Sequence, residues 1–474
     1  MTRPSPTVHA VRDDALGEDD ACALLARLAA REVSPHELVQ ASVARAREVN
    51  DALNAVAAWV ERGSVPSDVG GDGAFSGIPT VLKDNEDLAG YPTTQGSRAV
   101  RDTVAAQHTP AVAHMLQLGL VPLAKTTLPE FGLTAVTESS RFGATRNPYH
   151  PGHTPGGSSG GTAALVAAGV VPIGHANDGG GSIRIPASCC GLVGLKPTRG
   201  RLPDRPELRR LPIGITTQGV LTRSVRDTAQ YYAESERVFR PTNLPAIGQV
   251  SGPSAARLRV ALVTKAPHGL AMDPEVVEQT VAVAGLLDRL GHGVEAIEPP
   301  VDERFGPDFL RYWQLLASGL QHAGAAIVGP GFDRTRTEAF TQYLSSRVAV
   351  DLPLLPGSLR RLRRLAHRHE SVFASYDLVL SPVLAQPPPE VGDLGPSVDP
   401  RTQLLRLVQW TTFTPLQNIS GSPAISLPLG WSRRGLPIGV QLTAPFGHER
   451  RLLEMAYELE QAVGRTPAQR AQGE

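Results

Sequence analysis

The sequence predicts an α/β fold in which helices cover both faces of a central, mixed and twisted β-sheet. One observation is a β-α-β pattern, in which segments 258–264 and 294–297 flank a helix from 273 to about 291. A second observation is a set of three short apolar segments, 378–380, 424–427 and 439–442, which we expect to join the same sheet. Short strands that alternate with helices are typical of α/β proteins.

Two further helices can be placed from local signals. Ser34 and Glu37 form a capping box with Pro35 at the first helical position, so a helix is expected from here to about Val49. A second helix is expected at 162–168, because this segment of small and apolar residues is typical of a buried helix. Prolines and glycines are frequent elsewhere, so we expect long loops between these elements.

The charge balance argues against a polyanionic partner. The 474 residues carry 46 basic and 46 acidic side chains, so nucleic acid is not expected as a main partner. The 13 histidines show no metal-ligand spacing, and neither a metal nor another cofactor is expected. His150 and His153 lie in a proline-rich loop and are interpreted as loop residues.

Neither end of the chain nor its most apolar stretch predicts a membrane protein. Residues 1–14 have no apolar core and do not resemble a signal peptide. The longest apolar stretch, 163–173, is too short to span a bilayer. The three cysteines, Cys22, Cys189 and Cys190, suit a reducing compartment, so the expected location is the cytoplasm. The adjacent pair is interpreted as packed apolar residues.

Two glycine-flanked serines are the most informative feature for function. Ser158 lies in GGSSGG, and Ser182 directly follows Gly179, Gly180 and Gly181. Consecutive glycines can turn several backbone N–H groups to one side, and such a nest binds anions. Acyl transfer needs N–H groups of this kind around the oxygen that gains charge. We therefore expect Ser182 to be a nucleophile and the three glycines to form its oxyanion hole.

Three other interpretations of these glycines are weaker. A flexible linker would not be followed by the apolar helix at 162–168. A phosphate-binding loop would carry G-K-[ST] after the glycines, and this chain does not. Residues 156–160 match the G-x-S-x-G nucleophile elbow, but that elbow follows a strand, and the two prolines in 149–155 disfavour one.

Lys83 is the expected base. It follows the apolar segment Ile78–Leu82, which predicts a strand that carries the lysine into the interior. Burial disfavours the charged form and can lower the lysine pKa from about 10.4 by several units. The alternative is a surface lysine paired with Asp84. Only four of the 46 basic residues are lysines, which favours a role that arginine cannot fill, namely release of a proton.

The segment from about 79 to 201 resembles the amidase signature family of serine hydrolases. The matching sequences are GIPTVLKDN, AKTTLPEFG, GATRNPYHPGHTPGGSSGGTAALVAAG and NDGGGSIRIPASCCGLVGLKPTRGR. Later segments, including FTPLQNISGSPAISLPLG and GLPIGVQLTAPFG, extend the resemblance over nearly the whole chain. It implies a single domain over 1–474 with a catalytic core at about 79–201. One departure is Asn177, where many members have Thr or Ser.

The resemblance implies a role for each residue of the motif. Ser182 is implied as the nucleophile, Ser158 as a bridging serine in a cis peptide with Gly157, and Lys83 as the terminal base. Three further residues are implied to hold the glycine loop: Ser159, Asp178 and Arg184. Lys83 would take a proton from Ser158, and Ser158 one from Ser182, so that amide hydrolysis proceeds through an acyl-enzyme on Ser182.

Residues 305–370 are the region where we expect substrate choice to be made. A helical stripe is formed by Phe309, Tyr312, Trp313, Leu316 and Leu320. Such a stripe is more often core than pocket, and both roles stay open here. A basic cluster is formed by Arg360, Arg361, Arg363, Arg364 and Arg368. A solvated helix face is the favoured interpretation, and the alternative is that the cluster attracts acidic substrates or a partner protein.

The expected substrates are small-molecule amides, and the same mechanism also fits esters and carbamates. Within the family, the chain looks most like bacterial amidases, including those that act on cyclic or synthetic amides and carbamates. Two alternatives are a glutaminase-type subunit of a transamidating complex and an inactive scaffold, although the intact Lys83, Ser158 and Ser182 contradict the second. The expected partners include no membrane, and a homodimer is left open.

Overall fold

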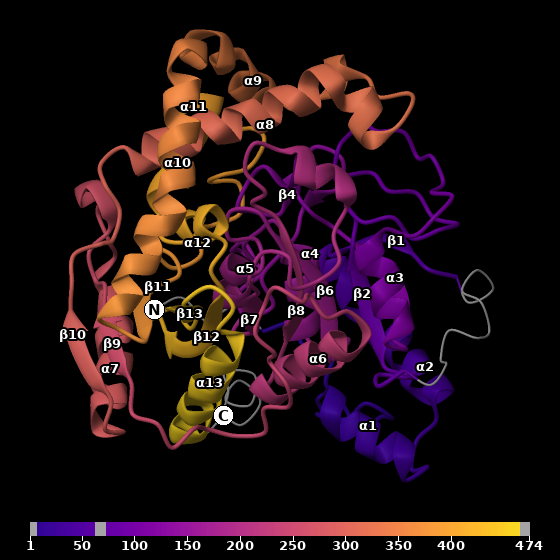
Figure 1. Cartoon of the computed structure of the whole chain (residues 1–474). Helices are drawn as coiled ribbons and strands as arrows, with labels where there is room; N and C mark the ends of the chain where they lie inside the picture. Colours follow the sequence, from indigo (N-terminus) through magenta and orange to yellow (C-terminus); the bar gives the residue numbers. More distant parts are fainter. Residues whose placement is uncertain (1–6, 62–72, 465–474) are drawn as a thin grey trace.

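A mixed eight-stranded sheet runs through the centre of the molecule (Figure 1). In spatial order its strands are β10 (Gly293–Ala296), β9 (Arg259–Leu262), β11 (Leu378–Pro382), β13 (Pro437–Thr443), β12 (Ala424–Trp431), β7 (Val193–Lys196), β8 (Thr217–Thr222) and β6 (Ile173–Asp178). Strands β10, β9 and β11 are parallel, and every pair from β11 to β6 is antiparallel. The predicted mixed sheet is confirmed, including the three short strands expected to join it.

This computed structural model describes residues 7–61 and 73–464. The first six residues of the N-terminal segment 1–14, in which no signal peptide is expected, lie outside the described residues. No helix within the described ranges is both long enough and apolar enough to cross a bilayer.

Helices pack on both faces of the sheet because the strands alternate their side chains between two apolar cores. Val220 of β8 joins a core with α6 (Val225–Val238), whereas its neighbour Leu221 joins a second core with α4 (Gly160–Ala167). The first core also takes in α1 (Ala21–Ala29), α3 (Pro110–Gln117), α7 (Pro274–Arg289) and α13 (Glu449–Val463). The second takes in α5 (Arg184–Cys189) and includes Cys189 and Cys190, which are buried as predicted.

The predicted local elements form with small shifts at their ends. Helix α2 (Pro35–Leu53) has both hydrogen bonds of the Ser34–Glu37 capping box and runs four residues beyond Val49. Helix α7 connects the parallel strands β9 and β10, which confirms the β-α-β element. Helix α4 is buried over most of its length, as expected for 162–168.

A separate three-stranded sheet carries Lys83. It consists of β1 (Val56–Trp59), β3 (Val121–Thr126) and β2 (Pro79–Lys83), in the order β1-β3-β2. Strand β2 is buried at every position. It contacts β6 of the central sheet through the Lys83 backbone N–H, which lies 3.4 Å from His175 Nδ1. The predicted strand is therefore present, one residue later than expected and outside the central sheet. A two-stranded ribbon pairs β4 (Glu138–Ser139) with β5 (Gly143–Ala144).

Four helices from the second half of the chain lie over one end of the central sheet (Figure 1). They are α8 (Phe305–Val328), α9 (Ala339–Asp351), α10 (Leu355–Glu370) and α11 (Pro400–Trp410), and the short α12 (Pro415–Ser420) packs beneath α10. The basic cluster on α10 is partly structural. Arg361 binds Asp308 of α8 with both contacts at 2.6 Å, and Arg363 donates to the Pro212 carbonyl. Arg363 is nevertheless exposed, as the solvated-face interpretation predicts, whereas Arg361 is only partly exposed and ties α10 to α8.

Candidate active site

Three segments meet where the two sheets adjoin. Lys83 is the last residue of β2, Ser158 lies in the loop that leads into α4, and Ser182 lies between β6 and α5. The loop before Ser158 contains no strand that could form a nucleophile elbow. The Gly157–Ser158 peptide is cis, as the family resemblance implies.

Lys83 and Ser158 are in direct contact. Lys83 Nζ lies 2.8 Å from Ser158 Oγ and 2.8 Å from Asn177 Oδ1. Both Lys83 and Ser158 are buried, so water does not compete for these contacts. The contact with Asn177 was not predicted, although the sequence marked this position as a departure from the family.

Burial prevents Lys83 from behaving as an ordinary lysine. Removal from water lowers its pKa to about 7, against the opposing influence of the Asp178 and Glu86 carboxylates. The alternative of a surface pair with Asp84 is wrong, because Asp84 binds Lys125 at 3.0 Å instead. Lys125 also donates to the Pro92 carbonyl and to the Thr93 hydroxyl, so it is held by contacts away from Lys83.

Ser182 lies at the floor of a pocket and is 8% exposed. Gly132 also lines this pocket, and a Cβ placed on it would lie 3.0 Å from Ser158 Oγ. Ser158 therefore lies next to Gly132 but is not itself one of the residues that line the pocket. Among the described residues, however, the Ser158 and Ser182 hydroxyls are not hydrogen-bonded to each other, so only two of the three motif residues are in direct contact.

The Asp178 carboxylate fixes the glycine loop. It accepts the Gly181 N–H at 2.7 Å and the Ile183 N–H at 3.3 Å. Burial alone would raise the pKa of Asp178, but the Arg184 guanidinium lowers it to about 2, so the carboxylate is charged. The Gly181 N–H is therefore already occupied, which is a correction to its expected place in the oxyanion hole.

Gly181 still has a strict conformational role. Its φ of +129° is strained for other residues, and a Cβ there would lie 2.4 Å from Thr414 Oγ1. Thr414 in turn donates to the Gly180 carbonyl at 2.6 Å. No hydrogen bond within the described residues uses the N–H groups of Gly179 and Gly180. Gly180 lines the pocket, and Gly179 precedes it in the loop.

Arg184 ties this loop to the C-terminal half of the molecule. It binds Asp178 through Nε at 2.9 Å and also donates to Gln417, Gln441 and Asn418. The implied loop-holding roles of Asp178 and Arg184 thus have matching contacts. Ser159 has a weaker link, because its Oγ lies 3.4 Å from the Asn177 carbonyl and does not reach the glycines.

Replacing Arg184 with methionine is expected to lower the free energy of unfolding by about 3–5 kcal/mol, because Asp178 would remain buried without its cation. Urea denaturation of Arg184→Met and of the double variant Arg184→Met/Asp178→Asn measures this effect. The double variant should recover part of the loss because it also removes the unpaired charge. A loss below about 1 kcal/mol in the single variant would contradict the assignment.

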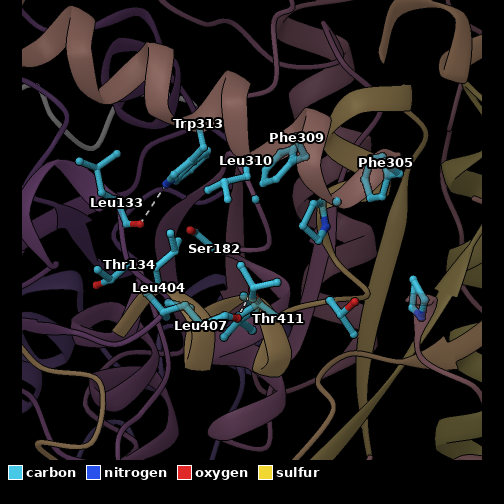
Figure 2. Close-up of a pocket in the computed structure, with 18 of the residues that line it drawn as sticks. Leu133, Thr134, Ser182, Phe305, Phe309, Leu310, Trp313, Leu404, Leu407 and Thr411 are labelled. Carbon is cyan, nitrogen blue, oxygen red and sulfur yellow. Dashed lines mark hydrogen bonds between the residues drawn. The ribbon is translucent and has the colours of Figure 1, made fainter. Parts of the chain in front are cut away.

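The pocket above Ser182 has two apolar walls (Figure 2). Figure 2 shows Phe305, Phe309, Leu310 and Trp313 of α8 on one side, Leu404, Leu407 and Thr411 of α11 and its C-cap on the other, and Ser182 between them. Gly180 faces the aromatic wall, since a Cβ there would lie 3.7 Å from the rings of Phe309 and Trp313. Trp313 Nε1 donates to the Leu133 carbonyl at 3.2 Å.

The predicted aromatic stripe on α8 therefore divides. Phe309 and Trp313 line the pocket, whereas Tyr312 is buried in the core and donates its hydroxyl to the Ile213 carbonyl. The α11 wall was not predicted from the sequence. No metal-binding cluster of three or more His, Cys, Asp or Glu side chains occurs in the described ranges.

The chain is similar to known proteins over nearly its whole length. A family model for amidases matches residues 37–453. A Mycobacterium tuberculosis protein designated AmiC is 49% identical over 459 residues, which are 96% of this chain and 97% of AmiC. The 6-aminohexanoate-cyclic-dimer hydrolase of Paenarthrobacter ureafaciens is 34% identical over 94% of each chain.

Solved structures agree with these matches. A 6-aminohexanoate cyclic dimer hydrolase complexed with substrate has a TM-score of 0.85 at 33% identity, covering 95% of this chain and 98% of its own. A glutamyl-tRNA(Gln) amidotransferase component from Thermotoga maritima has a TM-score of 0.72 at 26% identity, covering 95% and 96%.

The fold and these matches define a hydrolase that acts on carbon–nitrogen bonds. The chain belongs to the amidase family, which confirms the resemblance seen in its glycine- and serine-rich segments. Its activity is the hydrolysis of amides.

Proposed function

We propose that this amidase works through an acyl-enzyme on Ser182, with Ser158 and Lys83 transferring the protons. The observation that carries the proposal is the 2.8 Å contact between Lys83 Nζ and Ser158 Oγ, buried beside the pocket that Ser182 lines. A serine hydroxyl needs a base before it can attack a carbonyl. A lysine whose pKa is lowered to about 7 supplies that base at neutral pH.

The proposed proton transfers run from Ser182 through Ser158 to Lys83, and the last of these steps follows the observed Lys83–Ser158 contact. Neutral Lys83 accepts the proton of Ser158 while Ser158 accepts that of Ser182, and Ser182 Oγ attacks the carbonyl carbon. Ser158 then returns a proton to the leaving nitrogen, because an amide anion is too basic to depart unprotonated. Water cleaves the acyl-enzyme by the reverse path and releases the carboxylic acid. The two serine hydroxyls must approach each other when substrate binds, as catalytic hydrogen bonds often tighten only in the complex.

The free N–H groups of Gly179 and Gly180 are proposed to bind the oxyanion. Both belong to the loop that Asp178 and Arg184 hold rigid, so the donors need little reorganisation as charge develops. Gly181 contributes its backbone conformation, while its own N–H stays with Asp178.

We further propose that residues 1–474 form one domain with its catalytic core at about 79–201. Lys83, Ser158 and Ser182 all fall within that core. Region 305–370 is proposed to shape the substrate pocket, because Phe305, Phe309, Leu310, Trp313 and Phe340 line it.

The proposed substrate is an uncharged amide with an apolar acyl group. No described residue that lines the pocket is charged, and its polar side chains are limited to Ser182 and three threonines. A buried charge without a partner is strongly disfavoured, so a substrate with a charged acyl group would lose its hydration without compensation. The name of the similar cyclic-dimer hydrolase, which denotes a cyclic amide substrate, agrees with this choice. Apolar esters and carbamates are proposed as further substrates.

The main alternative is a glutaminase-type subunit that passes ammonia to a partner. The similarity to the glutamyl-tRNA(Gln) amidotransferase component favours it. Glutamine, however, carries an ammonium and a carboxylate near its amide, and the described lining of the pocket has no partner for either. We therefore favour the free-standing amidase.

A substrate panel tests this choice. We would compare kcat/KM for acetamide, hexanamide, an anilide of an apolar acid, a matched p-nitrophenyl ester, an aryl carbamate and glutamine. The expected result is a rise of at least about tenfold from acetamide to hexanamide and no measurable glutaminase activity. Efficient hydrolysis of glutamine, or equal rates for the two aliphatic amides, would contradict the proposed substrate class.

Replacing Trp313 with alanine is expected to lower kcat/KM for an aryl amide by at least about tenfold, mainly through KM, because the acyl group loses an aromatic wall. Acetamide, too small to reach that wall, should change much less. Trp59→Ala, on β1 and 37% exposed, is the matched control. Equal losses on both amides would mean that Trp313 supports the fold rather than the substrate.

A further inference from the structure

Asn177 stands between Lys83 and a buried carboxylate. Its Oδ1 lies 2.8 Å from Lys83 Nζ, and its Nδ2 lies 3.4 Å from Glu86 Oε1. Asn85 completes the cluster through a reciprocal amide pair with Asn177, at 3.1 and 3.3 Å. Asn177 and Glu86 are both buried, so protein groups alone determine how the amide is oriented.

Only one orientation of the Asn177 amide gives a hydrogen bond to both Glu86 and Lys83. Its NH2 group must face the Glu86 carboxylate, which only accepts hydrogen bonds, and its carbonyl oxygen must then face Lys83. Gln218 Nε2 also donates to Glu86 Oε1, at 3.0 Å, and holds the carboxylate in place. Glu86 therefore fixes which atom of Asn177 meets the lysine.

A carbonyl oxygen beside Lys83 has a chemical consequence. Neutral lysine has two N–H donors and one lone pair, and a carbonyl oxygen can accept an N–H but cannot donate to the lone pair. The lone pair is thus left for Ser158, the other group 2.8 Å from Nζ. A threonine or serine hydroxyl at position 177 could donate to the lone pair and compete with Ser158.

We propose that Asn177, oriented by Glu86, is a positioning residue that directs the Lys83 lone pair to Ser158, and that the Glu86 charge sets the pH at which Lys83 can act. This inference rests on the proposed role of Lys83 as the base. Neither Asn177 nor Glu86 touches the substrate pocket, so both act through the lysine.

Most of the other charged groups near Lys83 are engaged with partners of their own, so Glu86 is a carboxylate that can influence the charge of the lysine. On β6 and the loop after it, Asp178 is paired with Arg184, and His175 has a pKa lowered by burial. From β3, Lys125 is paired with Asp84. Glu86 has a looser partner, since Arg205 Nε lies 3.6 Å from Oε2, which accepts no hydrogen bond within the described residues.

Glu86 is ionised at neutral pH and acts on the pKa of Lys83. Burial alone would raise the pKa of Glu86, but the Arg205 guanidinium and the hydrogen bonds to its Oε1 bring it below the ordinary value. As an anion near Lys83, it raises the lysine pKa. Removing that charge should lower the lysine pKa and extend activity to lower pH.

The test is the pH profile of kcat/KM for an apolar amide in Glu86→Gln and Asn177→Asp. Glutamine keeps the acceptor oxygen and removes the charge, so the acid limb should move to lower pH by about half a unit or more. Aspartate adds a charge beside Lys83, so the limb should move to higher pH, with a lower rate at pH 7. A purely structural role would not give shifts of opposite sign.

Glu138→Gln is the matched control, because this buried carboxylate accepts the Gly392 N–H and does not contact Lys83. The acid limb of the pH profile of Glu138→Gln should have the same midpoint as that of the wild-type enzyme. An unmoved limb in Glu86→Gln, or an equal shift in Glu138→Gln, overturns the inference. Should Glu86→Gln fail to fold by circular dichroism, the direction of the shift in Asn177→Asp decides.

Lys83→Met separates this inference from the proposed function. If the acid limb survives in Lys83→Met, Lys83 is not the base and the proposed function fails. If it disappears there but does not move in Glu86→Gln or Asn177→Asp, only the inference about Asn177 and Glu86 fails.

Discussion

Replacing Ser182 with alanine is expected to reduce amide hydrolysis by at least about 10⁴-fold, because the substrate loses the only proposed nucleophile. The change removes one oxygen atom at the floor of the pocket and leaves the Asp178 contacts to the glycine loop in place. KM should therefore change little. Steady-state kinetics on an apolar anilide measures the loss, with circular dichroism to verify folding.

Ser42→Ala is a suitable control for Ser182→Ala. Ser42 is also buried, and its hydroxyl lies in α2 without a hydrogen-bond partner in the described residues. It should retain wild-type turnover. If Ser182→Ala kept more than about one hundredth of the wild-type rate, another residue would have to be the nucleophile.

Replacing Lys83 with methionine is expected to lower amide hydrolysis by about 10³-fold or more and to affect a matched activated ester much less. Both substrates need Ser182 to be activated, but only the amide also needs a proton on its leaving group. Methionine keeps a similar volume in the buried site, which limits the effect on the fold. Rates on a matched amide and p-nitrophenyl ester give the comparison, and equal losses on both would argue against the proton relay.

The same variant has a predicted pH signature. Because the pKa of Lys83 is lowered to about 7, wild-type activity should fall on the acid side with a midpoint near pH 7, as the base becomes protonated. That midpoint belongs to the coupled Lys83–Ser158 pair rather than to one group. The acid limb should vanish from the residual activity of Lys83→Met, and diethylpyrocarbonate should leave wild-type turnover largely intact. A limb that disappears only when a histidine is replaced would require a histidine base.

The motif residues could be predicted because the residues next to them in the sequence are enough to indicate their roles. Glycines flank Ser158 and precede Ser182, and consecutive glycines can present backbone N–H groups to an anion. The apolar run before Lys83 predicts that the lysine is buried. The start of the helix after Ser34 could be predicted for the same reason, since a capping box involves only four consecutive residues.

Contacts between distant segments could not be predicted in this way. Asn177 meets Lys83 across 94 positions of sequence, and Arg184 meets Gln441 across 257. The strand at Lys83 was predicted correctly, but its place in a separate sheet depends on pairing with β3. Periodicity also could not divide the α8 stripe into Trp313 at the pocket and Tyr312 in the core, because both belong to the same predicted apolar stripe.

The acyl-enzyme is the central claim, and trapping it is the most direct test. Wild-type protein would be mixed with an aryl carbamate or p-nitrophenyl ester of an apolar acid, quenched in acid within the first turnovers, and digested for peptide mass spectrometry. We expect the mass of one acyl group on the peptide that contains Ser182, and no such adduct in Ser182→Ala. Acylation at any other residue, or turnover by Ser182→Ala at the wild-type rate, would contradict the mechanism.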